Sequence, residues 1–476
     1  MTGSTPSQFK ENAVRQLADK DLRAALTKSK GHFTGGRQNA MDRLPEFDAL
    51  RDQARDIKDH VLENLDFYLE TYEENVISSG GTVHWARTAK DAQDIVLEIC
   101  RSVGATSVNK GKSMIGEECD INEALEAAGI RAVETDLGEY IIQIRNERPS
   151  HIIAPAVHLT KAQVEQSFRE THTHLDPDRV LEEPSTLLEE ARTVLRKKYF
   201  EAEVGITGAN FLVAETGSSI IVTNEGNGDL SQLLPKVHIV LASIEKVVPT
   251  LEDASTLLRV LARSATGQEF SVYTTLSTGP RRAGDPDGPE QYHVILLDNG
   301  RTGMLGTEFQ DMLRCIRCGA CMNHCPVYQS VGGHAYGWVY PGPMGAVLSP
   351  SLLGVSEAGH LPNASTFCGR CEEVCPVRIP LPKMMRHWRE REFERHLTPR
   401  AARMGIRAWA FVARRPALYQ WATGLQMRAM AWMGRRRGRF SSVPLAKGWT
   451  KYRELPAPEG RTFQQQWAQQ QKAGRR

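Results

Sequence analysis

The 476-residue sequence contains no uninterrupted apolar run that is long enough to cross a bilayer as a helix. Its first residues, MTGSTPSQFKENAVRQ, are polar and lack the apolar segment of a secretory signal. These two absences predict a cytoplasmic protein, in which thiols stay reduced. Nine cysteines in that setting indicate metal or redox chemistry and argue against disulfides.

The chain also lacks a large net charge, which is only +2, but the charge is unevenly distributed. Residues 378–476 hold 23 Lys and Arg against 5 Asp and Glu, so the rest of the chain is acidic. Such a basic tail is suited to an acidic partner protein, an anionic membrane surface or nucleic acid. We rank a partner protein first and peripheral membrane contact second, and expect no nucleic acid.

Two helices are expected in this tail. Thr398 and Pro399 have the residue types of a helix N-cap and first position, and Pro416 is suited to start a second helix. Leu418, Trp421, Leu425 and Trp432 would share one face of that second helix.

Residues 7–75 are predicted to be helical, and an alternation of strands and helices follows. GTVHWA, TSVNKG and IRAVET have the character of strands, with amphipathic helices between them. KVHIVLAS and YHVILLDNG are typical of buried strands, and NFLVAETGSSIIVTNEGN places two apolar runs around a turn. The alternation predicts an α/β fold with a parallel sheet.

The composition changes near residue 300, where TEFQDMLRC begins with Thr307 and has Gln310 at the spacing of a capping box. The helical character on both sides of the cysteine runs favours a mostly helical region there. We therefore divide the chain into an N-terminal helical region (1–75), an α/β domain (76–300), a helical cysteine-bearing domain (301–395) and a basic helical C-terminal region (396–476).

The first cysteine run is CIRCGACMNHCP, which places Cys315, Cys318, Cys321 and Cys325 at the spacing C-x2-C-x2-C-x3-C-P. This spacing is the ligation run of bacterial iron–sulfur proteins, in which the fourth cysteine binds the other of two clusters. Two-residue gaps allow one tight loop to present three soft thiolates to one cluster.

The second run, CGRCEEVCP, holds Cys368, Cys371 and Cys375 and matches the last three positions of the same motif. Ser365 stands where the first cysteine would be. If the last cysteine of each run binds the cluster of the other run, the first cluster is bound by Cys315, Cys318, Cys321 and Cys375. The second cluster is then bound by Cys325, Cys368 and Cys371.

Structural zinc is the alternative, but zinc sites usually show two separated cysteine pairs. The runs therefore favour two iron–sulfur clusters, of the [4Fe–4S] type. The second cluster lacks a fourth thiolate, so it is either a [4Fe–4S] cluster with a non-cysteine or open position or a [3Fe–4S] cluster. Ser365 is a ligand candidate in the first case, although an ordinary serine is the simpler interpretation.

Two loops of the α/β domain are candidate anion sites. NKGKSM offers Lys110 and Lys112, and AETGSS offers Thr216, Gly217 and Ser218. An ordinary tight turn between strands is the favoured alternative for each loop.

Several other residues attract attention and are given structural roles. His172 and His174 in THTH are expected in a solvated loop, whereas one of His151 and His158 is expected in the core. Cys100 and Cys119 stand alone and are expected to be buried thiols. Tyr336, Trp338 and Tyr340 are expected to cover the clusters from water.

The sequence resembles the iron–sulfur B subunits of the bacterial lactate-utilisation (Lut) family. The resemblance rests on GITGANFLVAETGSSIIVTNEGN and HVILLDNGR together with the two cysteine runs, and extends from about residue 30 to about residue 465. It implies a LUD domain similar to sugar-phosphate isomerases and CoA-transferases, a Rossmann-like fold, followed by an all-α double-cluster ferredoxin domain. B subunits of this family also carry seven cluster cysteines.

The resemblance further implies an electron-transfer subunit of a complex that oxidises L-lactate to pyruvate. Its partners would be a subunit with cysteine-rich repeats and a second LUD protein, through which it could associate with a membrane. Two alternatives stay open: a subunit that serves another 2-hydroxy acid such as glycolate, and an isomerase or acyl-transferase whose clusters are structural or sense redox state. No catalytic residue, electron acceptor or lactate site is identified.

Overall fold

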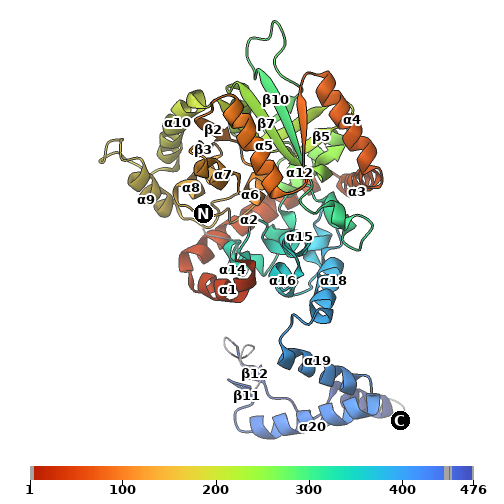
Figure 1. Ribbon diagram of the computed structural model, residues 1–476. Coiled ribbons are helices and arrows are strands. Elements are labelled where there is room, and N and C mark those ends of the chain that lie inside the picture. The colour runs from red at the N-terminus through yellow and green to blue at the C-terminus, as the bar shows by residue number, and fades with distance from the viewer. Residues whose placement is uncertain (1–4, 444–449, 451–452, 474–476) are drawn as a thin grey trace. The chain divides into compact units, whose positions relative to one another are not determined.

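The computed structural model describes residues 5–443, 450 and 453–473 (Figure 1). The chain forms two compact units, Met1–Glu392 and Phe393–Arg476. The residues before and after position 300 thus belong to one compact body, which holds both the α/β sheet and the cysteine runs.

The centre of the first unit is a six-stranded parallel sheet in the order β1-β10-β7-β4-β2-β3. The strands are β1 (Thr82–Ala86), β2 (Ser107–Lys110), β3 (Arg131–Glu134), β4 (Val204–Thr207), β7 (Val237–Ser243) and β10 (Gln291–Leu297). Both faces of the sheet are covered: Ile239 of β7 packs into one apolar cluster and Val240 into another. Covered faces explain the nearly continuous apolar runs and confirm the predicted parallel α/β fold.

Helices cover the two faces and one edge of this sheet. One face packs against α5 (Ala89–Ser102), α6 (Met114–Glu118) and α7 (Ile121–Ala127), and the other packs against α4 (Leu65–Ser78). At the edge, β3 packs with α8 (Leu137–Ile144), α9 (Lys161–Thr171) and α10 (Pro184–Glu201).

A second sheet has the order β8-β5-β6-β9. Its strands are β5 (Phe211–Val213), β6 (Ser218–Thr223), β8 (Val247–Val248) and β9 (Tyr273–Ser277), and α11 (Asn227–Leu233) and α12 (Leu251–Ala265) belong to the same part of the chain. The hairpin between β5 and β6 turns at Gly217, whose φ is +66°. A Cβ there would lie 2.5 Å from the backbone nitrogen of Val76, so the turn needs glycine in order to approach α4.

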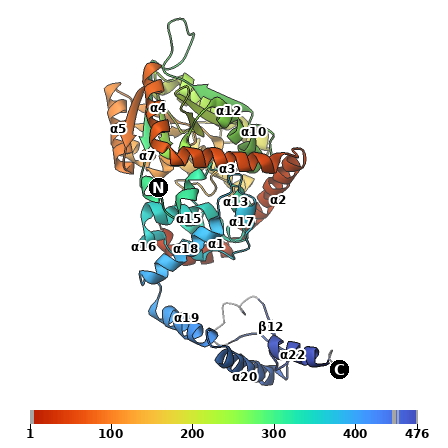
Figure 2. The same cartoon turned by 90° about the vertical axis from the view of Figure 1, so that its right-hand side faces the viewer.

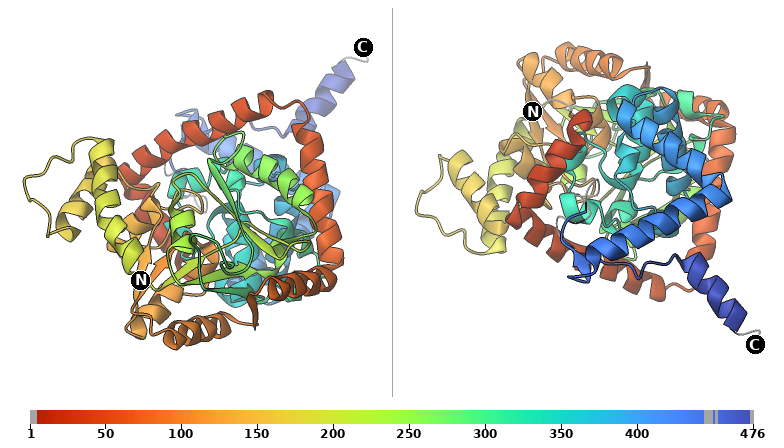
Figure 3. Two further views of the ribbon diagram at one scale, coloured as in Figure 1. Left: turned by 90° about the horizontal axis from the view of Figure 1, so that it is seen from above. Right: turned by 90° about the horizontal axis from the view of Figure 1, so that it is seen from below.

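The N-terminal helices are η1 (Pro6–Gln8), α1 (Phe9–Ala18), α2 (Lys20–Asp42), α3 (Phe47–Glu63) and the α4 helix. Seen from above, α2, α3 and α4 run one after another around the outside of the first unit (Figure 3). In the side view, α3 lies between the α/β region and the short helices that carry the cysteines (Figure 2).

From residue 298 to residue 392, every described element is a helix or a 3-10 turn. The elements are η3 (Thr302–Met304), η4 (Gln310–Arg314), α13 (Ala320–Asn323), α14 (Tyr328–Val331), η5 (His334–Tyr336), α15 (Gly342–Leu353), α16 (Val355–Ala358), η6 (Leu361–Asn363), α17 (Arg370–Glu373) and α18 (Leu381–Glu394); the earlier turn η2 spans Ile244–Lys246.

The predicted capping box at Thr307 is wrong. The Thr307 hydroxyl accepts from the N–H of Phe309 at 3.2 Å, and the Gln310 side chain accepts from the N–H of Gly306 at 2.7 Å. The two side chains therefore stabilise a turn, and the helix that precedes Cys315 is a short 3-10 segment.

The second unit contains α19 (Arg400–Ala413), α20 (Pro416–Gly434), the strand pair β11 (Arg439–Phe440) and β12 (Leu455–Pro456), and α22 (Phe463–Ala473). Pro416 is the first residue of its helix, as predicted, but Pro399 is itself the N-cap of α19, so the assignment of Thr398 as N-cap is wrong by one position. Among the described helices of the chain, none combines the length and the apolar character that crossing a bilayer requires.

Candidate functional site: two cysteine-lined cavities

One cavity is lined by Cys315, Cys318, Cys321 and Cys375. Three of these residues come from the first run, beside α13, and Cys375 follows α17 in the second run. The pKa of the Cys375 thiol is raised to about 11, mainly by burial and also by Cys315, while hydrogen bonds from the backbone N–H groups of Ile379 and Val377 oppose the rise. Burial and then the charge of Cys375 also raise the pKa of Cys318.

The second cavity is lined by Cys325, Cys368 and Cys371, together with Ser365. Burial raises the pKa of Cys371 to about 12, with a further contribution from Cys325. Cys368 is exposed, so this cavity lies nearer to the protein surface than the first. The structure thus gathers the seven cysteines into the two groups named from the sequence, while their ligand roles stay predictions.

The donor chemistry of both cavities fits iron–sulfur clusters. Cys318, Cys321, Cys371 and Cys375 have raised pKa values, first because burial disfavours the thiolate and also because a neighbouring cysteine thiolate would repel it. A positively charged metal centre removes that repulsion and is bound by the deprotonated sulfurs. The cysteines that line the two cavities supply soft sulfur ligands, which is the ligand type that iron–sulfur clusters use.

The two cysteine loops repeat the same backbone conformation. Arg317 and Gly319 have φ values of +59° and +74°, and Phe367 and Gly369 have +53° and +79° at the corresponding positions. Ser365 therefore occupies the structural position of Cys315, and its hydroxyl accepts from the N–H of Phe367 at 3.1 Å. A left-handed backbone at a non-glycine residue is strained, so its repetition indicates a loop shape that the site requires.

Two arginines of the N-terminal helices hold the second cysteine run in place. Arg51 of α3 donates from Nη2 to the carbonyl of Cys375 at 2.8 Å, and Arg37 of α2 donates to the carbonyl of Val374 at 3.1 Å. Both arginines are at least 96% buried. Sequence analysis missed them, although Arg51 and Lys58 lie two helical turns apart on the otherwise apolar face of α3, which was an available signal.

A buried ion network joins the α/β domain to the first cysteine loop. Arg301 forms a bidentate pair with Glu118 at 2.7 and 2.9 Å, and its Nε lies 3.0 Å from Glu245. Glu245 in turn lies 3.2 Å from Arg317, which sits between two cysteines of the first run. Burial raises the pKa of Glu245, but Arg301 and Arg317 lower it more, so that it falls to about 2. The network therefore carries ionised carboxylates in the protein interior.

The long connection between the two cysteine runs contributes three aromatic residues to the core. Tyr336, Trp338 and Tyr340 are all buried. Tyr340 donates to Glu118 at 2.6 Å and lies beneath Arg317, whose guanidinium carbon is 5.0 Å from the ring centroid. Burial raises the pKa of the Tyr336 hydroxyl well above its ordinary value, and the cysteines Cys325 and Cys321 raise it further.

The two candidate anion loops have different surroundings. Lys110 is buried and paired at 2.7 Å with both Glu117 and Glu134, so its ammonium is not available to a ligand. Lys112 lines a cavity of about 250 Å³ in the α/β domain. The segment Thr216–Ser218 is the tight turn described above and does not line that cavity.

Of the two histidines in THTH, His174 is exposed as predicted, but His172 is buried. The expectation of a solvated loop is wrong for His172, which is 1% exposed and bonds to the Tyr140 hydroxyl at 2.8 Å and to Glu190 at 2.7 Å. Its acidic partner lies on α10, 18 residues away, so local spacing could not show it. His151 is also buried, and its Nε2 bonds to Asn323 of α13 at 2.8 Å.

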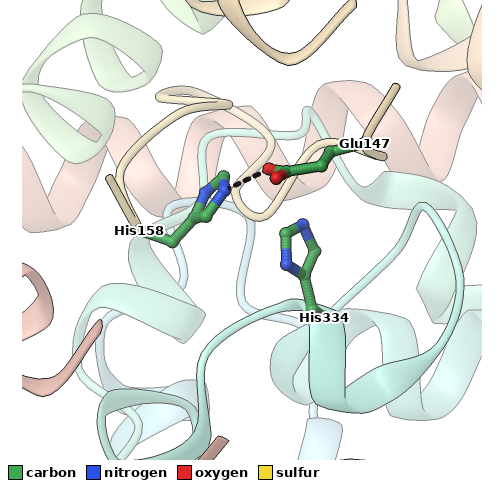
Figure 4. Close-up of side chains that lie close together, drawn as sticks. All are labelled: Glu147, His158 and His334. Atoms are coloured by element: carbon green, nitrogen blue, oxygen red, sulfur yellow. Dashed lines mark hydrogen bonds and ion pairs between the residues drawn. The ribbon is translucent and has the colours of Figure 1, made fainter. Parts of the chain in front are cut away.

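A further cluster brings together Glu147, His158 and His334 (Figure 4). Glu147 bonds to Nε2 of His158 at 2.8 Å, and Nε2 of His334 donates to the carbonyl of Arg148 at 2.7 Å. The bond from His334 joins η5, in the connection between the two cysteine runs, to the 145–158 loop of the α/β domain. The bond between Glu147 and His158 lies within that loop.

Comparison with known proteins relates this architecture to characterised families. Residues 69–297 match the LUD domain, residues 311–379 match the 4Fe-4S dicluster domain, and residues 377–472 match the C-terminal region of lactate utilisation protein B.

Relatives align along nearly the whole chain. Lactate utilization protein B of Bacillus licheniformis is 42% identical, with 96% of this chain and 95% of the relative covered. Lactate utilization protein B of Bacillus subtilis is 41% identical, with 98% and 97% covered. The chain belongs to the lactate utilisation protein B family. The resemblance stated from the sequence is confirmed. Another relative, the uncharacterized electron transport protein YkgF of Escherichia coli K12, is 41% identical over 96% of this chain and 95% of its own.

Proposed function

We propose that this chain is the iron–sulfur electron-transfer subunit of a multi-subunit complex that oxidises L-lactate to pyruvate. The observation that carries the proposal is the pair of cysteine-lined cavities inside a member of the lactate utilisation protein B family. The glycolate and isomerase or acyl-transferase alternatives are not favoured, since the aligned family members carry the lactate name over nearly their full length.

Cys315, Cys318, Cys321 and Cys375 would hold one [4Fe–4S] cluster. Cys325, Cys368 and Cys371 would hold a second, with either a non-cysteine fourth position or a [3Fe–4S] composition. When bound, such clusters supply reversible one-electron transfer. The protein's own contribution is to exclude water with buried aromatic residues and to hold the ligand loops in place through Arg37 and Arg51.

The finer fold assignments also belong to this proposal. We assign the α/β domain to the Rossmann-like group of sugar-phosphate isomerases and CoA-transferases, and residues 301–395 to an all-α double-cluster ferredoxin domain. The parallel sheet and the helical cysteine-bearing segment support these assignments.

The partners would be a subunit with cysteine-rich repeats and a second LUD protein. The C-terminal unit is suited to dock on one of them, because Trp409, Trp421 and Trp432 are each at least 65% exposed on basic helices. Large exposed aromatic residues beside arginines are typical of protein interfaces.

Growth of a deletion strain tests the proposed function. Complementation with the wild-type chain should restore growth on L-lactate, whereas Cys318→Ser and Cys371→Ser should not. Cys100→Ser is the matched control, since Cys100 is buried outside both cavities. Growth on L-lactate with both cluster variants, or a growth defect only on glycolate, would contradict the proposal.

Replacing Ser365 with cysteine is expected to complete the second set of thiolates, because Ser365 has the backbone position of Cys315. EPR of anaerobically purified, oxidised protein measures the change: a [3Fe–4S] signal in the wild type should disappear in Ser365→Cys, because oxidised [4Fe–4S] is silent. An exposed serine replaced in the same way serves as control. A wild-type [3Fe–4S] signal that persists in Ser365→Cys would contradict the assignment of this position.

A further inference from the structure

The cavity of about 250 Å³ in the α/β domain opens where the carboxyl ends of β2 and β4 meet. Gly111–Ser113 follow β2 and Thr207–Asn210 end or follow β4, and both segments line it. In the sheet, β3 lies on one side of β2 and β4 lies on the other. The strand order therefore reverses between β2 and β4, and the cavity lies at this switch point of the parallel sheet. Ligands of open α/β sheets bind at such points.

This cavity shares a wall with the first cysteine cavity. Ile152 and Arg317 line both. Arg317 belongs to the loop between Cys315 and Cys318, so a molecule in the larger cavity would contact a residue of the first cysteine loop.

The lining of the larger cavity contains a buried cation without a partner in the described chain. Lys246 is 6% exposed, lines the cavity and, among the described residues, has no hydrogen-bond or ion-pair partner. Its neighbour Glu245 is already paired with Arg301 and Arg317, and the Nε of Arg317 is also without a partner in the described chain. A buried ammonium group without a partner is costly, so the arrangement favours an anion beside Lys246.

The remaining walls limit which anion fits. Asp136 and Glu225 face the cavity, so a doubly charged phosphate would meet two carboxylates, whereas a singly charged ligand meets less repulsion. The volume is below the roughly 300–1,000 Å³ typical of sites for drug-sized ligands, which favours a small molecule. Asn210 accepts from the N–H of Val222 through Oδ1 at 2.9 Å, and this leaves its amide N–H groups to donate to a second ligand oxygen.

We propose that this cavity binds a small 2-hydroxy or 2-oxo carboxylic acid. Lys246 and Arg317 would hold its carboxylate against the wall of the first cysteine cavity, and Asn210 would bond to the oxygen on the neighbouring carbon. The inference deepens the proposed function and rests on it for the class of acid.

Calorimetric titration of the anaerobically purified, iron-loaded full chain tests the site, with L-lactate, pyruvate and inorganic phosphate as separate probes. We expect one molecule of L-lactate or pyruvate per chain, and a loss of affinity of about tenfold or more in Lys246→Met, which removes a charge-assisted hydrogen bond. Asn210→Asp should weaken binding similarly, because it keeps the acceptor for Val222 and adds a negative charge. Asn64→Asp, an exposed change remote from the cavity lining, should bind like the wild type.

Three results would overturn the inference: no binding of either acid, tighter binding of phosphate than of both acids, or unchanged affinity in Asn210→Asp. Iron content and reduction by dithionite are measured on the same samples. Iron-loaded, reducible protein that binds neither acid contradicts only the carboxylate site, whereas iron-free protein contradicts the proposed electron-transfer function.

Discussion

Replacing Cys375 with alanine is expected to leave the same surviving cluster as replacing Cys318, although the two cysteines belong to different runs. Both line the first cavity, and burial is the main cause that raises the pKa of each thiol. Removal of either thiolate leaves three cysteines in the first cavity and leaves the three cysteines of the second cavity in place. The first cluster should be altered in the same way in both variants, so their iron and sulfide per chain and their reduced EPR spectra should match each other and differ from those of the wild type.

Cys371→Ala supplies the decisive comparison, because Cys371 lies four residues from Cys375 in the sequence but lines the second cavity. The EPR spectrum of Cys371→Ala should keep the signal of the first cluster and change that of the second, whereas Cys375→Ala should do the reverse. Cys100→Ala, another buried thiol, should keep all of its iron. If Cys375→Ala instead matches Cys371→Ala, each run would serve its own cluster and the crossed assignment would be wrong.

Replacing Arg301 with methionine is expected to lower the free energy of unfolding by about 3–5 kcal/mol, the usual cost of removing one partner from a buried ion pair. Arg301 is fully buried and faces Glu118 and Glu245, so its loss leaves two interior carboxylates without their main cation. Urea denaturation of the anaerobic protein, followed by fluorescence, measures the change.

Arg281→Met is the matched control. Arg281 lies 3.1 Å from Glu290, but both side chains are about half exposed, so its loss should cost about 0–1 kcal/mol. Equal unfolding midpoints for the two variants would show that the buried network does not stabilise the first unit. A double variant, Arg301→Met with Glu118→Leu, should recover part of the loss because it removes one unpaired charge.

The parallel sheet was predictable because its strands are buried on both faces. Such strands are apolar along most of their length, and the runs 239–242 and 294–297 show this in the sequence itself. The start of α5 was also accessible to local reasoning, since its capping box involves only Thr88 and Asp91. The capping box predicted at Thr307 failed because the same residue types stabilise turns equally well.

Long-range polar partners could not be predicted. Lys110 was one candidate for an anion-binding loop, although an ordinary turn was favoured, and Glu134 of the neighbouring strand pairs with it. His172 pairs with a glutamate on another helix, and Arg51 meets the carbonyl of a residue more than 300 positions later. In each case the sequence shows the polar group, but only the packing of distant elements brings its partner within hydrogen-bond reach.

By itself the sequence determined the chemistry available to this protein: seven clustered thiols at cluster-forming spacing, apolar strands for a parallel sheet, and a basic C-terminal region. These features are local, because loop geometry and side-chain alternation act over a few residues. Only the tertiary structure decided where that chemistry is placed. It made Ile152 and Arg317 part of the lining of both the first cysteine cavity and the cavity of the α/β domain, and it left Lys246 buried in the lining of the latter without a partner in the described chain. That arrangement depends on contacts between segments that are far apart along the chain.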